Sequence, residues 1–405
     1  IGTIIRGVAT LATSKPEHFK SVGLLLEKQA KKYPNNPAIL QDDKVYSYAE
    51  LNQWANRYCH YFQSLGIQSG DSISIMIENR PETLAVALAT IKLGAVACMI
   101  NTAQRGEILT HSLTLVKSKL IVVGEELFEA VEEVRDELDS VTASRLHYVK
   151  DDNSKTLPTH FHDLDKAAEI CSTENPDSTK KVQLKQPCFY IFTSGTTGLP
   201  KASVMTHYRW FKSMAGMGIA SMRLKSDDTL YISLPLYHNN ALTVSLGAAL
   251  GNGAALALAR KFSVSRFWDD VRHYDATAFC YIGELCRYLL NGEAKDNDKD
   301  HKIRKIIGNG LRPEIWHDFK QRFGIKHINE FYGASECNLV FTNALNLDST
   351  AGICPLSYQV IEYDINEDQP VRNAKGFMNP VSPGETGLLI TEITQRSPFD
   401  GYTDK

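Results

Sequence analysis

The chain has 405 residues, of which 43% are hydrophobic and 22% charged, and its formal net charge is −3. A chain of this length and composition predicts a globular protein with two or three packed subdomains rather than one core. Lys and Arg are spread along the sequence, which argues against the basic surface of a nucleic-acid-binding protein, so we expect no nucleic-acid partner.

Eight cysteines are scattered along the chain and none of them forms a C-x-x-C pair. This spacing argues against metal clusters and disulfide exchange, and it favours reduced, buried thiols in a reducing compartment. No secretory signal is recognisable in residues 1–11, which are apolar but short and contain Arg6. We therefore expect a cytoplasmic protein, with peripheral contact to the inner face of a membrane and homodimer formation left open.

Helix and strand signals alternate along the first part of the chain. Ser47 and Glu50 form a capping box that opens a helix. Apolar periodicity and Pro or Gly boundaries predict helices over 22–33, 47–66 and 81–94. Apolar runs predict strands over 73–77, 95–100 and 120–123. This order predicts a mostly parallel sheet with helices on both faces.

One stretch of the second half imitates a membrane span. Residues 242–259 contain no charged residue, and their number approaches the ~20 residues that a bilayer requires. The turn signal Gly251-Asn252-Gly253 interrupts this stretch, so we predict a buried helix over 241–250 followed by a buried strand over 254–259.

Composition changes suggest where the subdomains meet. Residues 151–185 are polar and are expected to form a surface excursion, and 293–302 a solvated, charged loop. After residue 345 the helical period fades and short apolar runs alternate with Pro and Gly. We therefore predict an α/β subdomain, a second α/β subdomain that carries the chemistry, and a small antiparallel β subdomain, over residues 1–185, 186–344 and 345–405.

The strongest chemical signal lies between two predicted strands, 188–192 and 202–205. It places two glycines, four hydroxyls and one cation in the nine residues Thr193-Ser194-Gly195-Thr196-Thr197-Gly198-Leu199-Pro200-Lys201. Glycines let backbone N–H groups turn toward an anion, while hydroxyls and an ammonium group add donors and charge. The spacing is not that of a Walker loop. The pattern predicts a loop that binds a polyphosphate, and a Gly/Thr-rich solvent loop is the alternative.

This loop resembles the phosphate loop of the adenylate-forming (AMP-binding) superfamily, which includes acyl-CoA synthetases and luciferases. Three later segments are similar to further motifs of that family, in the same order: Gly308-Asn309-Gly310-Leu311, Tyr332-Gly333-Ala334-Ser335-Glu336 and 384–389. Residues 281–290, 308–313 and 399–402 are similar to its fatty-acid transport protein and very-long-chain acyl-CoA synthetase branch. The resemblance covers nearly the whole chain.

The resemblance implies a fold and an activity. The fold would be the α/β N-terminal domain of such an enzyme, with two doubly wound α/β subdomains and a small β-barrel-like subdomain, without the family's C-terminal domain. The activity would be a two-step ligation in which ATP and a long-chain fatty acid give acyl-AMP, and the acyl group then passes to coenzyme A. A ligase for an aryl, short-chain or carnitine-type acid and a fatty-acid uptake module stay as alternatives.

Adenylation brings a carboxylate to the α-phosphate, so the site needs cationic charge and a metal ion. By resemblance, Glu336 and Thr193 bind Mg²⁺, which prefers few carboxylates together with phosphate oxygens and water. The resemblance assigns the β- and γ-phosphates of ATP to Ser194, Gly195, Thr196, Thr197, Gly198 and Lys201. If these roles hold, the hairpin around position 195 and Glu336 must meet at one triphosphate.

The remaining roles also follow from the resemblance. Ser335 would reach the α-phosphate side, and Tyr332 would stack on adenine opposite the wall formed by Gly308, Asn309, Gly310 and Leu311, with Gly333 and Ala334 in the same nucleotide motif. His238 would lie near the α-phosphate and the acyl entrance, which makes Lys201, His238 and Glu336 the catalytic candidates. Leu242 would line the acyl chain, although a plain core helix explains its apolar surroundings equally well.

Overall fold

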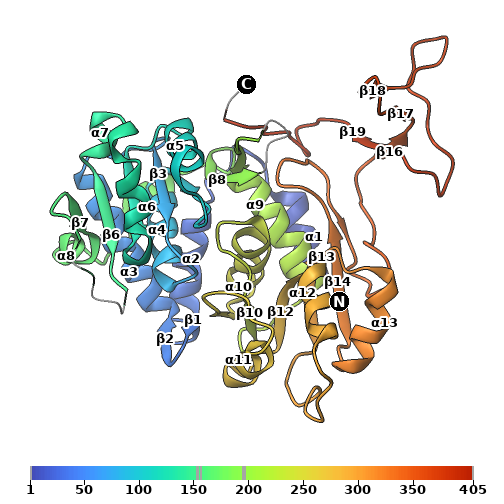
Figure 1. The fold of residues 1–405 in the computed structure, drawn as a ribbon, viewed down its shortest axis with the longest axis horizontal. Helices are drawn as coiled ribbons and strands as arrows, with labels where there is room; N and C mark the ends of the chain where they lie inside the picture. Colours follow the sequence, from blue (N-terminus) through green and yellow to red (C-terminus); the bar gives the residue numbers. More distant parts are fainter. Residues whose placement is uncertain (1, 152–154, 156, 194–197, 404–405) are drawn as a thin grey trace.

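Two mainly parallel sheets form the frame of the molecule and carry helices on their faces (Figure 1). The computed structural model describes residues 2–151, 155, 157–193 and 198–403. The first sheet has seven strands in the order β7-β6-β5-β3-β4-β8-β9, and only its β8–β9 hairpin is antiparallel. Its strands are β3 Ser72–Met76, β4 Val96–Met99, β5 Leu120–Gly124, β6 Leu146–Val149, β7 Phe161–Asp163, β8 Pro187–Thr193 and β9 Lys201–Thr206.

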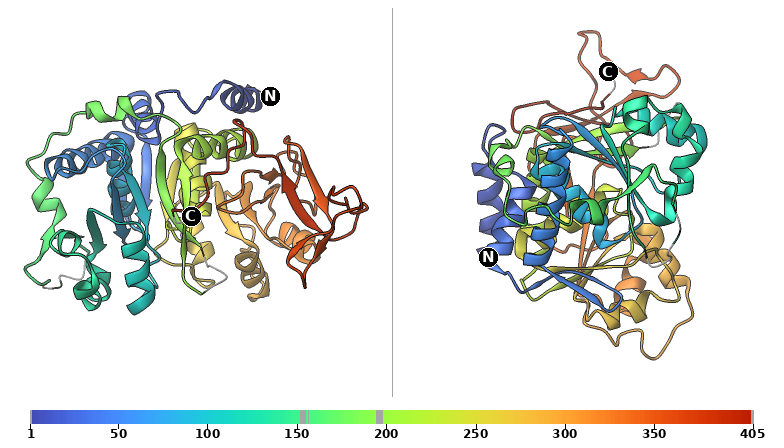
Figure 2. Two further views of the ribbon diagram at one scale, coloured as in Figure 1. Left: turned by 90° about the horizontal axis from the view of Figure 1, so that it is seen from above. Right: turned by 90° about the vertical axis from the view of Figure 1, so that its left-hand side faces the viewer.

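The second sheet has eight strands in the order β15-β14-β13-β12-β10-β11-β1-β2, and it lies beside the first (Figure 2). Its six inner strands pair in parallel, whereas both edge strands are antiparallel. The strands are β1 Pro37–Gln41, β2 Lys44–Ser47, β10 Thr229–Ile232, β11 Ala255–Leu258, β12 Ala278–Ile282, β13 Lys305–Asn309, β14 His327–Tyr332 and β15 Phe341–Thr342.

Sheet membership crosses the boundary expected at residue 185 in both directions. Strands β1 and β2 come from the first segment but join the second sheet, and β8 and β9 come from the second segment but join the first sheet. The boundary therefore does not separate the sheets, and the division into three subdomains stays a prediction. The segment 151–185 was expected to be a surface excursion. Its described part instead adds the edge strand β7, where Phe161 is buried.

The helices that periodicity predicted are confirmed. The capping box is present, because the Ser47 hydroxyl accepts a hydrogen bond from the Glu50 N–H and the Glu50 carboxylate accepts one from the Ser47 N–H (2.7 Å). The α-helices are α1 Gly2–Thr13, α2 Val22–Lys32, α3 Tyr48–Ser64, α4 Pro81–Lys92, α5 Gly106–Leu115, α6 Phe128–Glu133, α7 Ser140–Ala143, α8 Leu164–Ala168, α9 His207–Ser213, α10 Leu246–Asn252, α11 Phe267–His273, α12 Gly283–Asn291 and α13 Pro313–Arg322. Two π-helices, η4 Met214–Met222 and η5 Asn240–Ser245, and three short 3₁₀-helices, η1 Glu125–Leu127, η2 Arg135–Glu137 and η3 Asp177–Lys181, complete the set for the described residues.

The apolar stretch 242–259 folds as a helix, a turn and a strand, as predicted. It begins in η5 and continues through α10, which ends at Gly253 in the left-handed conformation (φ +75°) before β11 begins. Within the described ranges, every helix is too short or too polar to reach across a bilayer.

The C-terminal part is antiparallel, as predicted, but the prediction of a barrel-like shape is wrong. Its described residues form two separate ribbons, β16 Tyr358–Ile361 with β19 Leu388–Thr391 and β17 Tyr363–Asp364 with β18 Gln369–Pro370, and no closed barrel. Of the described residues after 345, only Ile361 and Ser397 are buried, so the strands have no apolar inner face around which to close. The ribbons extend away from the sheets (Figure 1).

Candidate active site

The β8–β9 hairpin carries the predicted phosphate loop at its tip. Thr193 ends β8 and pairs with Lys201, which begins β9, and both are half-buried. Four of the predicted phosphate ligands, Ser194, Gly195, Thr196 and Thr197, lie outside the described residues. Gly198 follows them with φ +91°, a backbone conformation that glycine adopts without steric cost.

The end of the chain returns to this hairpin (Figure 1). The Val204 N–H donates to the Gly401 carbonyl and the Thr403 N–H donates to the Ala202 carbonyl, both at 3.0 Å. Residues 401–403 therefore run antiparallel to β9, with Tyr402 opposite Ser203. This pairing places the Lys201 Nζ 5.5 Å from the centre of the Tyr402 ring.

The loop that bears Ser335 and Glu336 follows β14 and is held by Arg209, a residue of α9. The Arg209 Nη2 donates to the Ser335 and Cys337 carbonyls, both at 2.7 Å, and its Nη1 donates to the Val204 carbonyl at 2.9 Å. The Arg209 Nε lies 3.9 Å from an Asp400 carboxylate oxygen. We call Arg209, these three carbonyls and Asp400 the Arg209 clamp. It fastens the Glu336 loop to β9, and sequence reasoning did not find it.

Three predicted ligands meet around Tyr402. Burial raises the pKa of Tyr402, the charge of the nearby Glu336 carboxylate raises it further, and the nearby Thr193 side chain opposes these effects. Because Lys201 lies over the same ring, the structure brings Thr193, Lys201 and Glu336 together.

The donors at this place suit magnesium. The described residues contain no group of three or more His, Cys, Asp and Glu side chains that could enclose a metal ion. Glu336 and Thr193 supply hard oxygen donors, and a Mg²⁺ ion held by so few protein groups completes its shell with phosphate oxygens and water. The residues present therefore fit a magnesium ion that arrives with a triphosphate.

The adenine-loop motif lies at the carboxyl end of β13, next to β14. Gly308 pairs with Glu330, and a Cβ added at Gly308 would lie 2.1 Å from the Tyr281 carbonyl oxygen. Gly310 has φ +81°. Both positions therefore require glycine, because a side chain would force the backbone to move.

Glu330, which sequence reasoning missed, holds the backbone of this loop with its carboxylate. Its Oε1 accepts hydrogen bonds from the Gly310 N–H (2.5 Å) and the Leu311 N–H (3.3 Å), and its Oε2 accepts one from the Tyr281 hydroxyl. Burial raises the pKa of Glu330 to about 7, although these hydrogen bonds oppose the shift. The available signal was a glutamate between Asn329 and Phe331, in the segment that forms β14.

Tyr332 and His238 belong to segments that adjoin the adenine loop. Tyr332 ends β14 with 59% of its surface exposed, so a face of its ring is free to stack. The His238 side chain is exposed, yet the protein atoms around it lower its pKa by partial desolvation. The Asn240 amide donates to the Asn309 side chain at 2.8 Å, which ties the segment after His238 to the adenine loop.

Leu242 is fully buried in the main core, and its carbonyl accepts a hydrogen bond from the Trp210 indole at 3.2 Å. This residue lines neither of the two hollows described next. Its role in acyl binding therefore stays a prediction.

A groove of about 530 Å³ opens between the carboxyl ends of the two sheets. Three cationic side chains (Arg105, Arg260 and Lys261) and two glutamates (Glu78 and Glu284) line it, together with the apolar and aromatic side chains of Leu127, Leu234, Tyr237, Phe262, Ile282, Leu285 and Tyr288. Lys261 pairs with Glu78 at 2.9 Å and Arg260 pairs with Asp151 at 2.7 Å. The exposed Arg105 donates only to carbonyls of its own loop, Thr102 and Gln104, among the contacts of the described residues.

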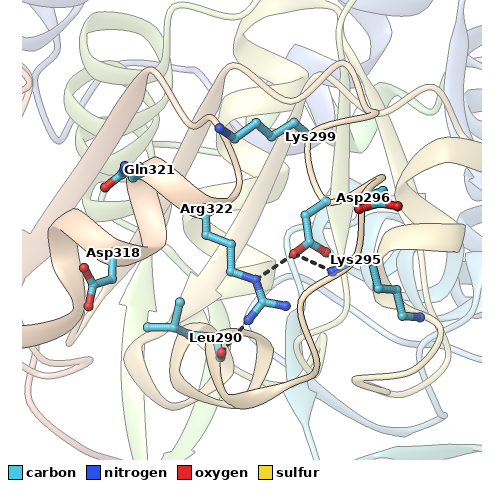
Figure 3. A pocket seen from close by; sticks show the side chains of 8 residues that line it. Leu290, Lys295, Asp296, Lys299, Asp318, Gln321 and Arg322 are labelled. Carbon is cyan, nitrogen blue, oxygen red and sulfur yellow. Dashed lines mark hydrogen bonds and ion pairs between the residues drawn. The ribbon is translucent and has the colours of Figure 1, made fainter.

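A second hollow, of about 570 Å³, lies between α12 and α13 and contains none of the predicted site residues (Figure 3). Arg322 crosses it and donates to the Leu290, Gly292 and Glu293 carbonyls, and its Nε pairs with Asp298 at 2.7 Å. We call these groups the Arg322 clamp. It holds the charged loop 293–302, so this hollow is explained by loop structure.

Known proteins resemble the chain in both sequence and fold. A family model described as AMP-binding enzyme matches residues 26–402. A medium/long-chain-fatty-acid–CoA ligase of Mycobacterium tuberculosis is 44% identical over 401 residues, which cover 99% of this chain and 65% of the ligase. Long-chain fatty acid transport protein 2 of Rattus norvegicus is 37% identical over 384 residues, which cover 93% of this chain and 61% of that protein.

The chain thus spans less than two thirds of the length of these relatives. A crystal structure of an anthranilate CoA ligase in complex with anthranoyl-AMP superposes with a TM-score of 0.81 and 18% identity, covering 98% of this chain and 73% of the ligase. At that identity the likeness concerns the fold, and it confirms the predicted α/β architecture.

Proposed function

The chain belongs to the AMP-binding enzyme family, and we propose that it activates a long-chain fatty acid with ATP to acyl-AMP and then transfers the acyl group to coenzyme A. The meeting of Thr193, Lys201 and Glu336 around Tyr402 carries this proposal. It puts a cation and two oxygen ligands at the place where a triphosphate would lie.

The reaction needs charge compensation, because an anionic acid attacks the anionic α-phosphate and pyrophosphate leaves. Lys201 supplies one positive charge next to the phosphate loop. A bound magnesium ion would add the rest by neutralising charge on the phosphate oxygens. In this proposal Glu336 and Thr193 hold that ion, and Ser194, Gly195, Thr196, Thr197 and Gly198 orient the β- and γ-phosphates.

The adenine ring would lie between Tyr332 and the loop 308–311. The exposed Tyr332 face offers stacking, and the glycines let the backbone approach the base closely. His238 would stay uncharged at neutral pH, since its surroundings lower its pKa, and could donate a hydrogen bond near the α-phosphate. The acyl chain would then extend past His238 toward Leu242.

The identity of the acid rests on the relatives, which are named for medium- and long-chain fatty acids. A series of acids from acetate to long-chain fatty acids, with benzoate and carnitine included, tests it in a pyrophosphate-release assay. Activity restricted to short, aromatic or carnitine-type acids would contradict the proposal. Fatty-acid uptake that persists after adenylation is abolished would favour the transport alternative.

We further propose that coenzyme A enters through the groove between the sheets. Coenzyme A combines phosphates, an adenine ring and a long flexible arm, and the groove combines three cationic side chains with an apolar and aromatic lining. Arg105 has no carboxylate partner among the described contacts, so its charge is available for a phosphate.

Glu336→Gln tests the metal role, because the amide keeps the shape of the side chain but not its charge. We expect ATP affinity measured calorimetrically in saturating Mg²⁺ to fall by about 100-fold, and affinity in EDTA to stay unchanged. Glu314→Gln, at an exposed glutamate of α13, is the matched control and should have no effect. Equal loss with and without Mg²⁺ would refute the metal role.

A further inference from the structure

Asn79 lies between β3 of the first sheet and α4, and its side chain reaches across to the second sheet. Its Nδ2 donates to the Leu234 carbonyl at 2.8 Å and to the Ala259 carbonyl at 3.3 Å. Its Oδ1 accepts a hydrogen bond from the Leu236 N–H at 2.8 Å. One amide group therefore joins the segment after β3 to the segments that follow β10 and β11. Neither the resemblance nor the comparisons assign it a role.

The three contacts suit an asparagine. Two of the partners are carbonyls, which accept, and one is an N–H, which donates, so the position needs a side chain with two donors and an acceptor. Asn79 is 6% exposed, and Leu234, Leu236 and Ala259 are buried as well. Buried peptide groups depend on partners inside the protein. The Asn79 backbone is held in turn, because its carbonyl accepts from the Gln41 side chain at 2.7 Å.

The chain reaches His238 two residues after Leu236. The His238 N–H donates to the Pro235 carbonyl at 3.1 Å, which closes a turn over 235–238. Pro235 begins this turn and lies between the two residues of the segment that Asn79 holds. After the turn, the Asn240 side chain is tied to the adenine loop. The segment that carries His238 is therefore fixed from the first sheet on one side and from the adenine loop on the other.

We propose that Asn79 is a positioning residue for the adenylation step, because it fixes the turn 235–238 and thereby the direction in which His238 points. This inference rests on the proposed function, in which His238 donates a hydrogen bond near the α-phosphate. Asn79 acts through the backbone that carries His238, not by contact with ATP or the acid. Asn79 and Tyr237 also line the groove between the sheets. Pyrophosphate release in the absence of coenzyme A therefore isolates the effect on His238 from any effect on the groove.

Asn79→Ala tests this, because it removes all three side-chain contacts. We expect the first-turnover rate of pyrophosphate release with a long-chain fatty acid to fall by about 100-fold, the cost of a misplacement of about 1 Å. Calorimetric ATP affinity should change by less than about twofold, since the phosphate hairpin and the Glu336 loop are held by other contacts. Asn79→Asp should give the same division, because it keeps the shape of the side chain but turns an oxygen toward two carbonyls.

A matched control and a double variant separate positioning from general stability. Asn56 is a buried asparagine of α3 whose Nδ2 donates to the Thr173 carbonyl at 2.7 Å and to the Asn175 side chain at 3.0 Å. Asn56→Ala should lower the urea midpoint of unfolding as Asn79→Ala does, but leave the rate of pyrophosphate release unchanged. If Asn79 acts through His238, adding Asn79→Ala to His238→Ala should lower the rate by less than about threefold further.

Three results would overturn the inference: an unchanged rate in Asn79→Ala, an equal loss of rate and ATP affinity in that variant, or a full further loss of rate in the double variant. The same loss of rate in Asn56→Ala would also overturn it, because a general effect of stability would then explain the result. An unmodified chain that released no pyrophosphate with any acid would instead contradict the proposed function, and the inference with it.

Discussion

Two loops of this protein are held by the same device, and only one of them carries proposed chemistry. In the Arg209 clamp and in the Arg322 clamp, an arginine donates to three main-chain carbonyls and approaches one aspartate. The Arg322 clamp spans the hollow of Figure 3. The Arg209 clamp lies at the edge of the phosphate hairpin.

The difference between the clamps is the distance along the chain that each one bridges. Arg322 reaches carbonyls 29 to 32 residues away, within one pair of neighbouring helices. Arg209 reaches Ser335 and Cys337, 126 and 128 residues away, and also approaches Asp400. The Arg322 clamp therefore shapes a local loop, whereas the Arg209 clamp joins three remote segments into one site.

The largest effect should come from breaking each clamp in turn. Arg209→Ala and Arg322→Ala each remove one partner of a largely buried ion pair, so each should lower the free energy of unfolding by about 3 kcal/mol. Only Arg209→Ala should also weaken Mg-ATP binding, by about 100-fold, because only it releases the Glu336 loop. Urea unfolding and titration calorimetry on both variants measure the two effects.

These two variants control for each other. Similar destabilisation with an unequal loss of ATP affinity supports the distinction between a local and a site-forming clamp. Equal ATP affinities of the two variants would show that the Glu336 loop keeps its place without Arg209. That result would contradict the distinction between the two clamps.

A third arginine sharpens the comparison, since Arg105 has no aspartate or glutamate partner in the described contacts and clamps only its own loop. Arg105→Ala should weaken coenzyme A binding by about tenfold and leave ATP affinity unchanged, as expected for the loss of one charged contact to a phosphate. The control is Arg57→Ala, at an exposed position of α3. Unaltered binding of coenzyme A would remove the groove between the sheets as its site.

The smallest effect on ATP affinity concerns the other half of the nucleotide site, where a buried carboxyl group rather than an arginine holds the loop. The pKa of Glu330 is raised to about 7, above its value in the unfolded chain. As pH rises from about 4.5 to 7, the unfolded state releases this proton first, so the stability contributed at low pH is lost over that window, by at most about 3 kcal/mol. Above pH 7 this contribution no longer changes.

Glu330→Gln removes this titration while keeping an oxygen that can accept from the Gly310 N–H. The stability of the variant relative to the parent should therefore be higher at pH 8 than at pH 5, as read from urea unfolding at both values. ATP affinity should fall only a few-fold, because the loop keeps most of its contacts. A stability difference that is independent of pH would show that Glu330 does not titrate in this window.

Local patterns in the sequence predicted much of the fold. The capping box at Ser47, the hairpin around the phosphate loop and the helix–turn–strand over 241–259 all depend on neighbours a few residues apart. Sheet order was not predictable in the same way, because β1 pairs with β11 across more than two hundred residues. The polar composition of residues 151–185 gave no sign of the edge strand β7, in which Phe161 is the one buried residue.

The same distinction applies to the site. Resemblance named the residues expected to touch the nucleotide, but not Arg209 or Glu330. Both residues act through contacts with segments far away in sequence, and nothing in their immediate neighbours requires an arginine or a glutamate. Their roles become visible only where the remote segments meet.

The central claim is that the phosphate hairpin and Glu336 hold one triphosphate and its metal ion. Crystals of this chain grown with ATP and Mn²⁺ in place of Mg²⁺ would test it directly, because anomalous diffraction locates the manganese ion. We predict the ion in direct coordination with Glu336, next to phosphates contacted by Lys201. A triphosphate bound elsewhere, or a metal ion that does not contact Glu336, would contradict the account.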